Sequence, residues 1–220
     1  MTILNLGGGY GDFTVNLAQI PKTAVGHVDF SQSANKVASE LVEKNHLTAN
    51  TEIITSDNRE YLRQLINLGQ HVDMIFIYGG LAENTPFESD IEEILQLATL
   101  SLNPGGYLWY VGLEQPLLRD AEDRIATDIL GEYPSKPGLI REIVLKTPSM
   151  YLVRDINGEI RPDNHPLVIG GTSEDHTHVV YRGLFIKENI DGSLPVTPDF
   201  GFKNAVNPNW PSVFEGFQTT

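Results

Sequence analysis

The chain contains no cysteine, which excludes disulfide bonds, zinc–thiolate sites and catalysis by a thiol. It also contains no apolar run that approaches the roughly 20 residues needed to span a bilayer. The first residues, MTILNLGGG, have neither the basic start nor the small-residue cleavage site of a secretion signal. We therefore expect no membrane partner and a cytoplasmic location, which is the default for such a chain.

Basic residues are scarce, because 15 Lys and Arg face 29 Asp and Glu and the net charge is −14. Such a chain repels phosphate backbones and anionic lipid surfaces, so we do not expect a nucleic acid as partner or substrate. The acidity either keeps the protein in solution or selects a neutral or cationic substrate. The first interpretation is the more general, because net charge acts on solubility before it acts on partners.

The 220 residues, of which 40% are apolar, are enough for one domain with a buried core, with or without an appendage. From residue 3 onward, short apolar runs alternate with helical patterns. Ser31 is expected to cap the second helix and Gly69 to end the third. Five repeats of strand and helix predict an α/β fold with a doubly wound, mainly parallel sheet. The expected strands are 3–6, 24–29, 51–56, 72–78 and 107–113, and a fifth helix is expected over 116–129.

The alternation ends after residue 134. Residues 140–146 and 179–187 are predicted as strands, and 150–161 as a hairpin that turns at Asn157-Gly158. We expect three units: a main domain (1–146 and 179–189), a β-rich insertion before the last strand that could serve as a lid (147–178), and an irregular tail (190–220). The tail is expected to wrap the domain rather than be disordered, because five aromatic residues would be costly to leave in water: Phe200, Phe202, Trp210, Phe214 and Phe217.

A glycine-rich segment, Asn5 to Gly11, joins the first strand to the first helix. Ligands of open parallel sheets bind beyond the carboxyl ends of the strands, and glycines let a ligand approach the backbone there. The dinucleotide fingerprint G-x-G-x-x-G would need glycine where Asp12 stands, and a carboxylate fits badly beside a pyrophosphate. A G-x-x-x-x-G-K-[ST] loop is also absent. The segment therefore predicts a ligand that places no phosphate there, or merely a tight corner.

Polar side chains follow the second and third strands in the same register. Asp29 comes about 20 residues after the glycines, where an acid hydrogen-bonds ribose hydroxyls. Asp57 and Asn58 follow the third strand, where either can accept from an adenine amino group. The alternative is that each simply caps a helix. Three such features on three successive strands favour a nucleoside ligand.

Residues 3–114 resemble the class I S-adenosylmethionine-dependent methyltransferases. NLGGGYG is similar to their first motif, VGHVDFS to the second and SDN to the third. VDMIFIYGGL resembles the strand of the fourth motif, and LNPGGYLWYVGLE the segment that leads into the fifth strand. The resemblance covers about half of the chain. It is specific for the fold and the cofactor and says little about the methyl acceptor.

The resemblance implies that S-adenosylmethionine is the cofactor and assigns residues to its parts. The glycines approach it, Asp29 holds the ribose, Asp57 holds the adenine amino group, and Asn5 lies near the methionine end. Position 5 is usually acidic in the family, and a neutral amide can still accept a hydrogen bond from the ammonium with less attraction. The full predicted cofactor set is Asn5, Gly7, Gly8, Gly9, Gly11, Asp29, Phe30, Asp57, Asn58, Tyr78 and Gly79.

The helices that usually precede the first strand and cover the acceptor site are absent from this sequence. The lid is therefore expected from 147–178, from the tail, or from another subunit in a homodimer. A hydroxyl acceptor also needs a base, whereas an ionised acceptor does not. The candidate catalytic residues are His176, His178, Glu114 and Glu83, with His165 as a further histidine in the same region.

The predicted function is methyl transfer to an oxygen or nitrogen of a small molecule. The alternatives are other chemistry with the same cofactor, such as aminopropyl transfer, elimination or cyclisation, and a non-catalytic partner subunit. GGGYG also resembles spermidine synthases, but no aspartate follows the fourth strand as it does in that family. No [DN]-P-P-[YF] motif follows it either, which argues against methylation of base or glutamine amino groups. Asp175 to His178 could supply metal ligands, but the expectation is that no metal is bound.

Overall fold

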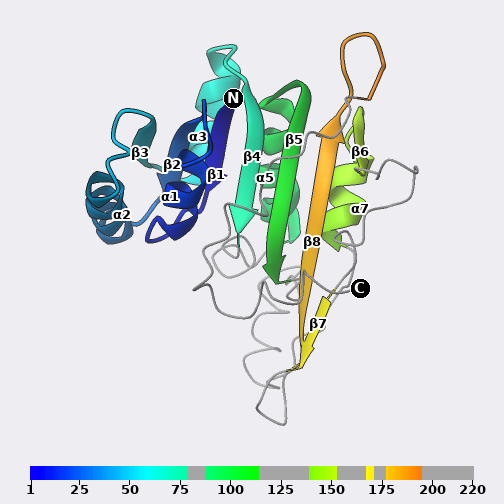
Figure 1. Ribbon diagram of the computed structural model, residues 1–220. Helices are drawn as coiled ribbons and strands as arrows, with labels where there is room; N and C mark the ends of the chain where they lie inside the picture. The colour runs from blue at the N-terminus through cyan, green and yellow to red at the C-terminus, as the bar shows by residue number, and fades with distance from the viewer. Residues whose placement is uncertain (79–87, 114–138, 153–166, 171–176, 195–220) are drawn as a thin grey trace.

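The structure is a computed structural model that describes residues 1–78, 88–113, 139–152, 167–170 and 177–194. Its first half alternates strands and helices, as Figure 1 shows. These elements are β1 (Thr2–Leu6), α1 (Asp12–Ala18), β2 (Ala24–Asp29), α2 (Gln32–Lys44), β3 (Thr51–Thr55), α3 (Asn58–Asn67), β4 (Val72–Tyr78), α5 (Glu88–Leu100) and β5 (Leu102–Leu113). The elements that follow are α7 (Leu139–Lys146), β6 (Met150–Leu152), β7 (Leu167–Gly170) and β8 (Thr177–Lys187).

All of the strands belong to one sheet with the order β3-β2-β1-β4-β5-β8-β6, and β7 pairs with β8 beside this path. Strands β1 to β5 are parallel, and β8 runs antiparallel to β5, β6 and β7. This arrangement confirms the predicted doubly wound, mainly parallel α/β fold. Strand order reverses between β1 and β4, so a ligand crevice is expected beyond their carboxyl ends.

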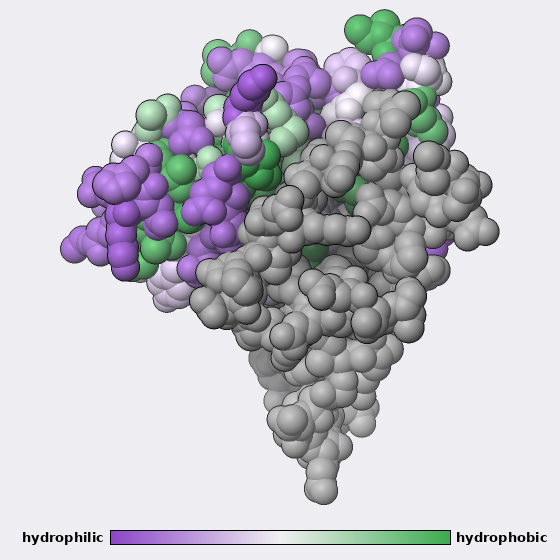
Figure 2. All heavy atoms as spheres, viewed as in Figure 1, coloured by the Kyte–Doolittle hydropathy of each residue, from purple (hydrophilic) through white to green (hydrophobic). Residues whose placement is uncertain are grey.

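Helices cover both faces of this sheet (Figure 1). On one face, α3, α5 and α7 bury an aliphatic core against the strands, to which they contribute Leu62, Leu65, Ile91, Ile94, Leu95, Ala98, Ile140, Ile143 and Val144. On the other face, α1 and α2 pack together. The side of α2 that faces the protein carries Ala34, Ala38 and Val42, and in Figure 2 the surface over α2 is largely hydrophilic. Both expected helix ends occur: the Ser31 hydroxyl accepts from Ala34 N, and Gly69 is left-handed.

One expectation for the second half of the chain is wrong. Residues 140–146 form helix α7 instead of a strand, because Ile140, Ile143 and Val144 recur at helical spacing and are buried together in the core. Residues 150–152, where the expected hairpin begins, form β6, which pairs with β8 in the main sheet. The proposed turn at Asn157-Gly158 and the helix expected over 116–129 lie outside the described residues.

The two short strands β6 and β7 lie at opposite ends of β8. In β6, Met150 pairs with Lys187, the last residue of β8. The neighbouring residue of β8, Ile186, pairs with Tyr107 in the first half of β5. Leu167 pairs with Val180, which also pairs with Leu113 at the end of β5. Strand β7 therefore lies at the carboxyl edge of the sheet and extends past β5, as Figure 1 shows. Within the described part of the chain, no helix is long and apolar enough to cross a membrane.

Candidate cofactor and active site

The glycine segment after β1 folds back onto the end of β2. The main-chain N–H groups of Gly7 and Gly8 both donate to Val28 O, at 2.8 and 3.1 Å. Gly7, Gly9 and Gly11 have φ values of 66°, 55° and 90°, which are conformations that side chains other than glycine rarely adopt. The chain then enters α1 with Gly11 as its N-cap residue. We call residues 7–11 the glycine loop.

Asp29 connects the glycine loop to the turn between β2 and α2. Its Oδ2 accepts from Gly9 N at 2.9 Å and its Oδ1 accepts from Ser31 N at 2.8 Å. The side chain is buried at the carboxyl end of β2. Each carboxylate oxygen has a second lone pair, so both can accept a further hydrogen bond from ribose hydroxyls. Asp29 therefore stands where the ribose acid was expected and also holds the loop.

Two of the glycines are fixed by close packing, whereas a third borders open space. A Cβ on Gly8 would lie 2.3 Å from Nδ1 of His27, and a Cβ on Gly11 would lie 2.8 Å from Cβ of Ala38. At Gly9 a Cβ would meet no atom of the described residues within 4 Å. Gly8 and Gly11 thus seat the loop on β2 and α2, and Gly9 leaves its outer side open to a ligand.

A row of hydrogen-bonded polar side chains lies buried beneath the glycine loop. Asn5 Nδ2 donates to Thr14 Oγ1 at 2.9 Å, and the same oxygen lies 2.7 Å from His27 Nδ1. His27 Nε2 lies 3.0 Å from Asn35 Oδ1, and Asn35 Nδ2 donates to the carbonyl of Asp29 at 2.9 Å. The four side chains that carry the row are at most 4% exposed. We call them the buried polar row: Asn5, Thr14, His27 and Asn35.

Of this row, only Asn5 was predicted from the sequence as a site residue. Thr14 and Asn35 were overlooked within helical stripes, and His27 within an apolar strand. The signal that could have found His27 is an ionisable residue inside the otherwise apolar β2, because such a residue needs buried partners. Burial lowers the pKa of His27, although its hydrogen bond to Asn35 and the negative charge of Asp29 act in the opposite direction.

Asp57 and Asn58 stand at the end of β3, as expected, and the structure shows the cap that was the alternative interpretation. Asp57 Oδ1 accepts from Arg59 N at 2.8 Å and from Glu60 N at 3.3 Å, which makes Asp57 the N-cap of α3. Asn58 Oδ1 is buried and has no hydrogen-bond partner among the described residues. A buried acceptor without a donor is unfavourable, so Asn58 Oδ1 can accept a hydrogen bond from a ligand at this end of β3.

Aromatic side chains flank the carboxyl edge of the sheet. Phe30 directly follows Asp29 and is 64% exposed, and Tyr10 in the glycine loop is 65% exposed. Tyr78 ends β4 and packs on Phe13 of α1, with 4.1 Å between the ring centroids. Burial raises the pKa of Tyr78, so its hydroxyl keeps its proton at neutral pH. Exposed Phe30 and Tyr10 provide apolar area beside Asp29, where a nucleoside would lie.

Of the four candidate catalytic residues, the described structure contains only His178. It lies on β8, where it pairs with Ile169 of β7, just beyond the Val180–Leu113 pair that marks the end of β5. His178 therefore belongs to the carboxyl edge, as the glycine loop does. Glu83, Glu114, His165, His176 and the cofactor candidate Gly79 lie outside the described residues, as does Asp175. Among the residues that are described, no group of three or more side chains could hold a metal ion.

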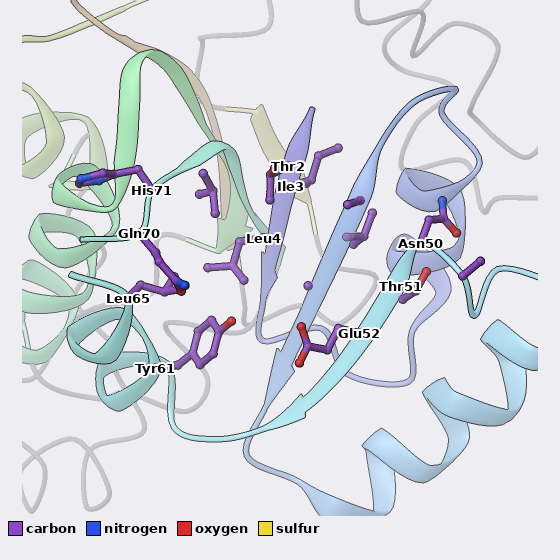
Figure 3. Close-up of a pocket in the computed structure, with 15 residues that line it drawn as sticks. Thr2, Ile3, Leu4, Asn50, Thr51, Glu52, Tyr61, Leu65, Gln70 and His71 are labelled. Atoms are coloured by element: carbon purple, nitrogen blue, oxygen red, sulfur yellow. The ribbon is translucent and has the colours of Figure 1, made fainter. Parts of the chain in front are cut away.

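A hollow of about 500 Å³ lies at the other end of the sheet. Its lining includes Thr2, Ala24, Thr51 and Val72, which are the first residues of β1 to β4. Figure 3 shows Tyr61 of α3 and Glu52 of β3 on opposite sides of it. The glycine loop follows β1 and Asp29 ends β2, so this hollow lies at the opposite end of the sheet from these candidate cofactor residues.

Comparison with known proteins agrees with this arrangement. Residues 3–106 match the family described as "Methyltransferase domain". Similar solved structures include a proposed sarcosine dimethylglycine methyltransferase from Galdieria sulphuraria, with a TM-score of 0.59, 13% identity and coverage of 86% of this chain and 78% of that chain. The N-methyltransferase NodS from Bradyrhizobium japonicum WM9 has a TM-score of 0.56 and 15% identity, and 86% of each chain is covered.

A third similar structure is the cyclopropane synthase MmaA2 from Mycobacterium tuberculosis, with a TM-score of 0.53, 18% identity and coverage of 70% of this chain and 56% of that chain. No curated protein matches the sequence. Residues 3–106 are therefore similar to a methyltransferase domain, and the chain has the fold of the class I S-adenosylmethionine-dependent methyltransferases. The match and the fold agree with the cofactor that the resemblance of the motifs predicted, S-adenosylmethionine.

Proposed function

We propose that this chain is an S-adenosylmethionine-dependent methyltransferase that acts on an oxygen or nitrogen atom of a small molecule. We further propose that it holds the cofactor between the glycine loop, Asp29 and Asn58. The observation that carries the cofactor site is the clamp in which Asp29 accepts from Gly9 N and Ser31 N at the carboxyl end of β2. That clamp joins the two segments that a nucleoside must contact, and the strand order reverses beside it.

The described residues fit S-adenosylmethionine. Asp29 offers carboxylate oxygens for the ribose hydroxyls, and Asn58 Oδ1 is a buried acceptor without a donor among the described residues. Phe30 presents an exposed ring next to Asp29, which suits the adenine face. Asn5 lies one residue before the end of β1 and Tyr78 ends the neighbouring strand β4, and we assign both to the methionine end.

The bound cofactor supplies a methyl group that its sulfonium has already activated. The residues of this chain then have to align the acceptor with that group and exclude water. Strand β7 and the start of β8 extend past the carboxyl edge and are the described part of the lid that we propose. His178 in that segment is the candidate to take the proton of a hydroxyl acceptor, and Glu83, Glu114 and His176 remain candidates outside the described residues.

The charge of the chain favours a small molecule over a nucleic acid. With a net charge of −14, the protein as a whole repels a phosphate backbone, and binding to nucleic acid would need a local basic surface to overcome that field. A neutral or cationic metabolite meets no such repulsion. The charge therefore bears on the methyl acceptor alone and not on which cofactor is bound.

The test is to incubate the protein with S-adenosylmethionine and a metabolite extract, and to search by mass spectrometry for a compound that gains about 14 Da, the mass of a methylene. Transfer of an aminopropyl group, or loss of the methionine chain without methylation, would contradict methyl transfer. His178→Ala should lower turnover but leave the affinity for S-adenosylhomocysteine unchanged. His71→Ala is the matched control, because His71 is exposed at the opposite edge of the sheet and should leave turnover unchanged.

A further inference from the structure

The hydrogen bonds of the buried polar row have only one consistent direction when His27 is neutral. The main-chain carbonyl of Asp29 can only accept, so Asn35 must turn its NH₂ group toward it. Asn35 Oδ1 then faces His27 Nε2, which must donate. The other ring nitrogen, Nδ1, is therefore an acceptor and takes the hydroxyl proton of Thr14.

This direction continues to the end of β1. Because Thr14 donates its one proton to His27, its oxygen can only accept from Asn5. Asn5 must therefore present its NH₂ group to Thr14, and its amide oxygen Oδ1 is turned away from Thr14. A single main-chain carbonyl at the end of β2 thus fixes the orientation of an amide at the end of β1, through three intervening side chains.

We propose that His27 is a positioning residue for the cofactor, which acts through Thr14 to hold the Asn5 amide with its oxygen toward the ammonium group of the methionine end. This inference rests on the proposed place of Asn5 at that end. A carboxylate would need no such control, because both of its oxygens accept. An amide can turn either way, and its NH₂ group would face an ammonium donor to donor. The buried polar row therefore supplies the orientation that lets a neutral residue do the work of an acid.

Protonation of His27 would reverse the two hydrogen bonds that link His27 to Thr14 and Thr14 to Asn5. Nδ1 would then donate to Thr14, whose proton would have to go to Asn5, so that the amide turns its NH₂ group toward the cofactor. The groups that pack on the ring from α1, α2 and the glycine loop are uncharged, namely Thr14, Asn35 and Gly8. Asp29, on the same strand, carries the charge that acts on it, and burial outweighs that charge and keeps the pKa lowered. Cofactor binding is thus expected to require neutral His27.

The test compares two ligands that differ at the methionine end. S-adenosylhomocysteine carries the ammonium, and 5′-methylthioadenosine shares the nucleoside and sulfur but lacks it. Thr14→Val removes the hydroxyl and should weaken S-adenosylhomocysteine about fivefold or more, with less than about twofold change for 5′-methylthioadenosine. Thr14→Ser should restore the affinity. Thr23→Val is the matched control, because the buried Thr23 hydroxyl bonds only main-chain carbonyls outside the row, those of Ile20 and Leu17.

Each outcome of the titration calorimetry has a distinct meaning. Equal losses for both ligands in Thr14→Val would overturn the inference and reduce Thr14 to a structural role. Failure of the unmodified protein to bind S-adenosylhomocysteine at all would instead contradict the proposed cofactor site. The unmodified protein gives a second test that does not depend on folding of a variant. Its affinity for S-adenosylhomocysteine should fall relative to 5′-methylthioadenosine as His27 takes up a proton, which its lowered pKa places below about pH 6.5. A ratio that stays constant while NMR of the ring shows that protonation would also overturn the inference.

Discussion

Replacing Gly8 by alanine should damage the protein far more than the same change at Gly9, although the two glycines are neighbours. An added Cβ at Gly8 would lie 2.3 Å from Nδ1 and 2.4 Å from Cε1 of His27. The ring cannot swing away freely, because it is fully buried and both of its nitrogens are hydrogen-bonded. Gly8 is not in the left-handed region, so alanine there tests packing without backbone strain.

The expected magnitude follows from two costs. Overpacking a well-packed site costs about 1–3 kcal/mol, and loss of a buried hydrogen bond as the ring shifts costs about 1–3 kcal/mol more. We therefore expect Gly8→Ala to lower the free energy of unfolding by about 2–6 kcal/mol. Gly9→Ala has open space but a φ of 55°, and this strain should cost about 1–2 kcal/mol.

Urea denaturation measures both free energies of unfolding, and calorimetry with S-adenosylhomocysteine measures the effect on the loop. A double variant, Gly8→Ala with His27→Ala, supplies the internal check, because removal of the ring removes the clash. The two changes should then couple favourably by about 1–3 kcal/mol, whereas independent sites would add within about 0.5 kcal/mol. A clash between Gly8 and His27 is refuted if Gly8→Ala is no more destabilising than Gly9→Ala. It is also refuted if the effects of Gly8→Ala and His27→Ala on the free energy of unfolding simply add.

Three further predictions concern the same region. Asp29→Ala should leave the N–H groups of Gly9 and Ser31 without their acceptor and lower the free energy of unfolding, measured by urea denaturation, by about 2–4 kcal/mol. Calorimetry should also find little binding of S-adenosylhomocysteine to this variant, and retained affinity would remove Asp29 from the site. The lowered pKa of His27 implies a contribution to stability that is present above about pH 6.5 and lost as the pH falls below it, because the unfolded chain then takes up a proton that the folded chain does not. His27→Gln should therefore flatten the pH dependence of the free energy of unfolding, measured by urea denaturation between about pH 5 and 7. An unchanged slope would count against a buried neutral imidazole. Asn5→Asp should raise the pKa of His27, because an ionised carboxylate at position 5 accepts the Thr14 proton, so that Nδ1 of His27 must carry a proton and donate to Thr14. ¹⁵N NMR of the ring should show the higher pKa, and an unchanged titration would refute the coupling between Asn5 and His27.

The parallel half of the fold could be predicted from the sequence because several local signals agree there. The strands at 24–29 and 72–78 have the predicted bounds, since each is a compact apolar run with polar or glycine neighbours. The second half lacked such agreement. Residues 140–146 are rich in Ile, Val and Leu, which favour a strand by composition, and only their packing against α5 makes the helical spacing decisive. At three residues, β6 is too short to show any period.

The candidate site divides in a similar way. Asp29 could be found because its distance from the glycines is a property of the chain. The buried polar row could not, because Asn5 and His27 become neighbours only through the register of β1 against β2, which the sequence does not state. Asp57 shows the opposite case, in which a residue assigned to the ligand caps a helix, as Ser, Thr, Asp and Asn at that position usually do.

The proposed cofactor site is thus preorganised by contacts that need no cofactor. Val28 O fixes the start of the glycine loop, Asp29 fixes its middle, and Gly11 lies against Ala38 at its end. A loop held at three points loses little conformational freedom when a ligand binds, so more of the interaction energy remains as affinity. The same reasoning explains the dense polar contacts beneath the loop. A carboxylate at position 5 would attract the ammonium wherever its oxygens turned, whereas an amide is useful only if it is held in one orientation, and the buried polar row holds it.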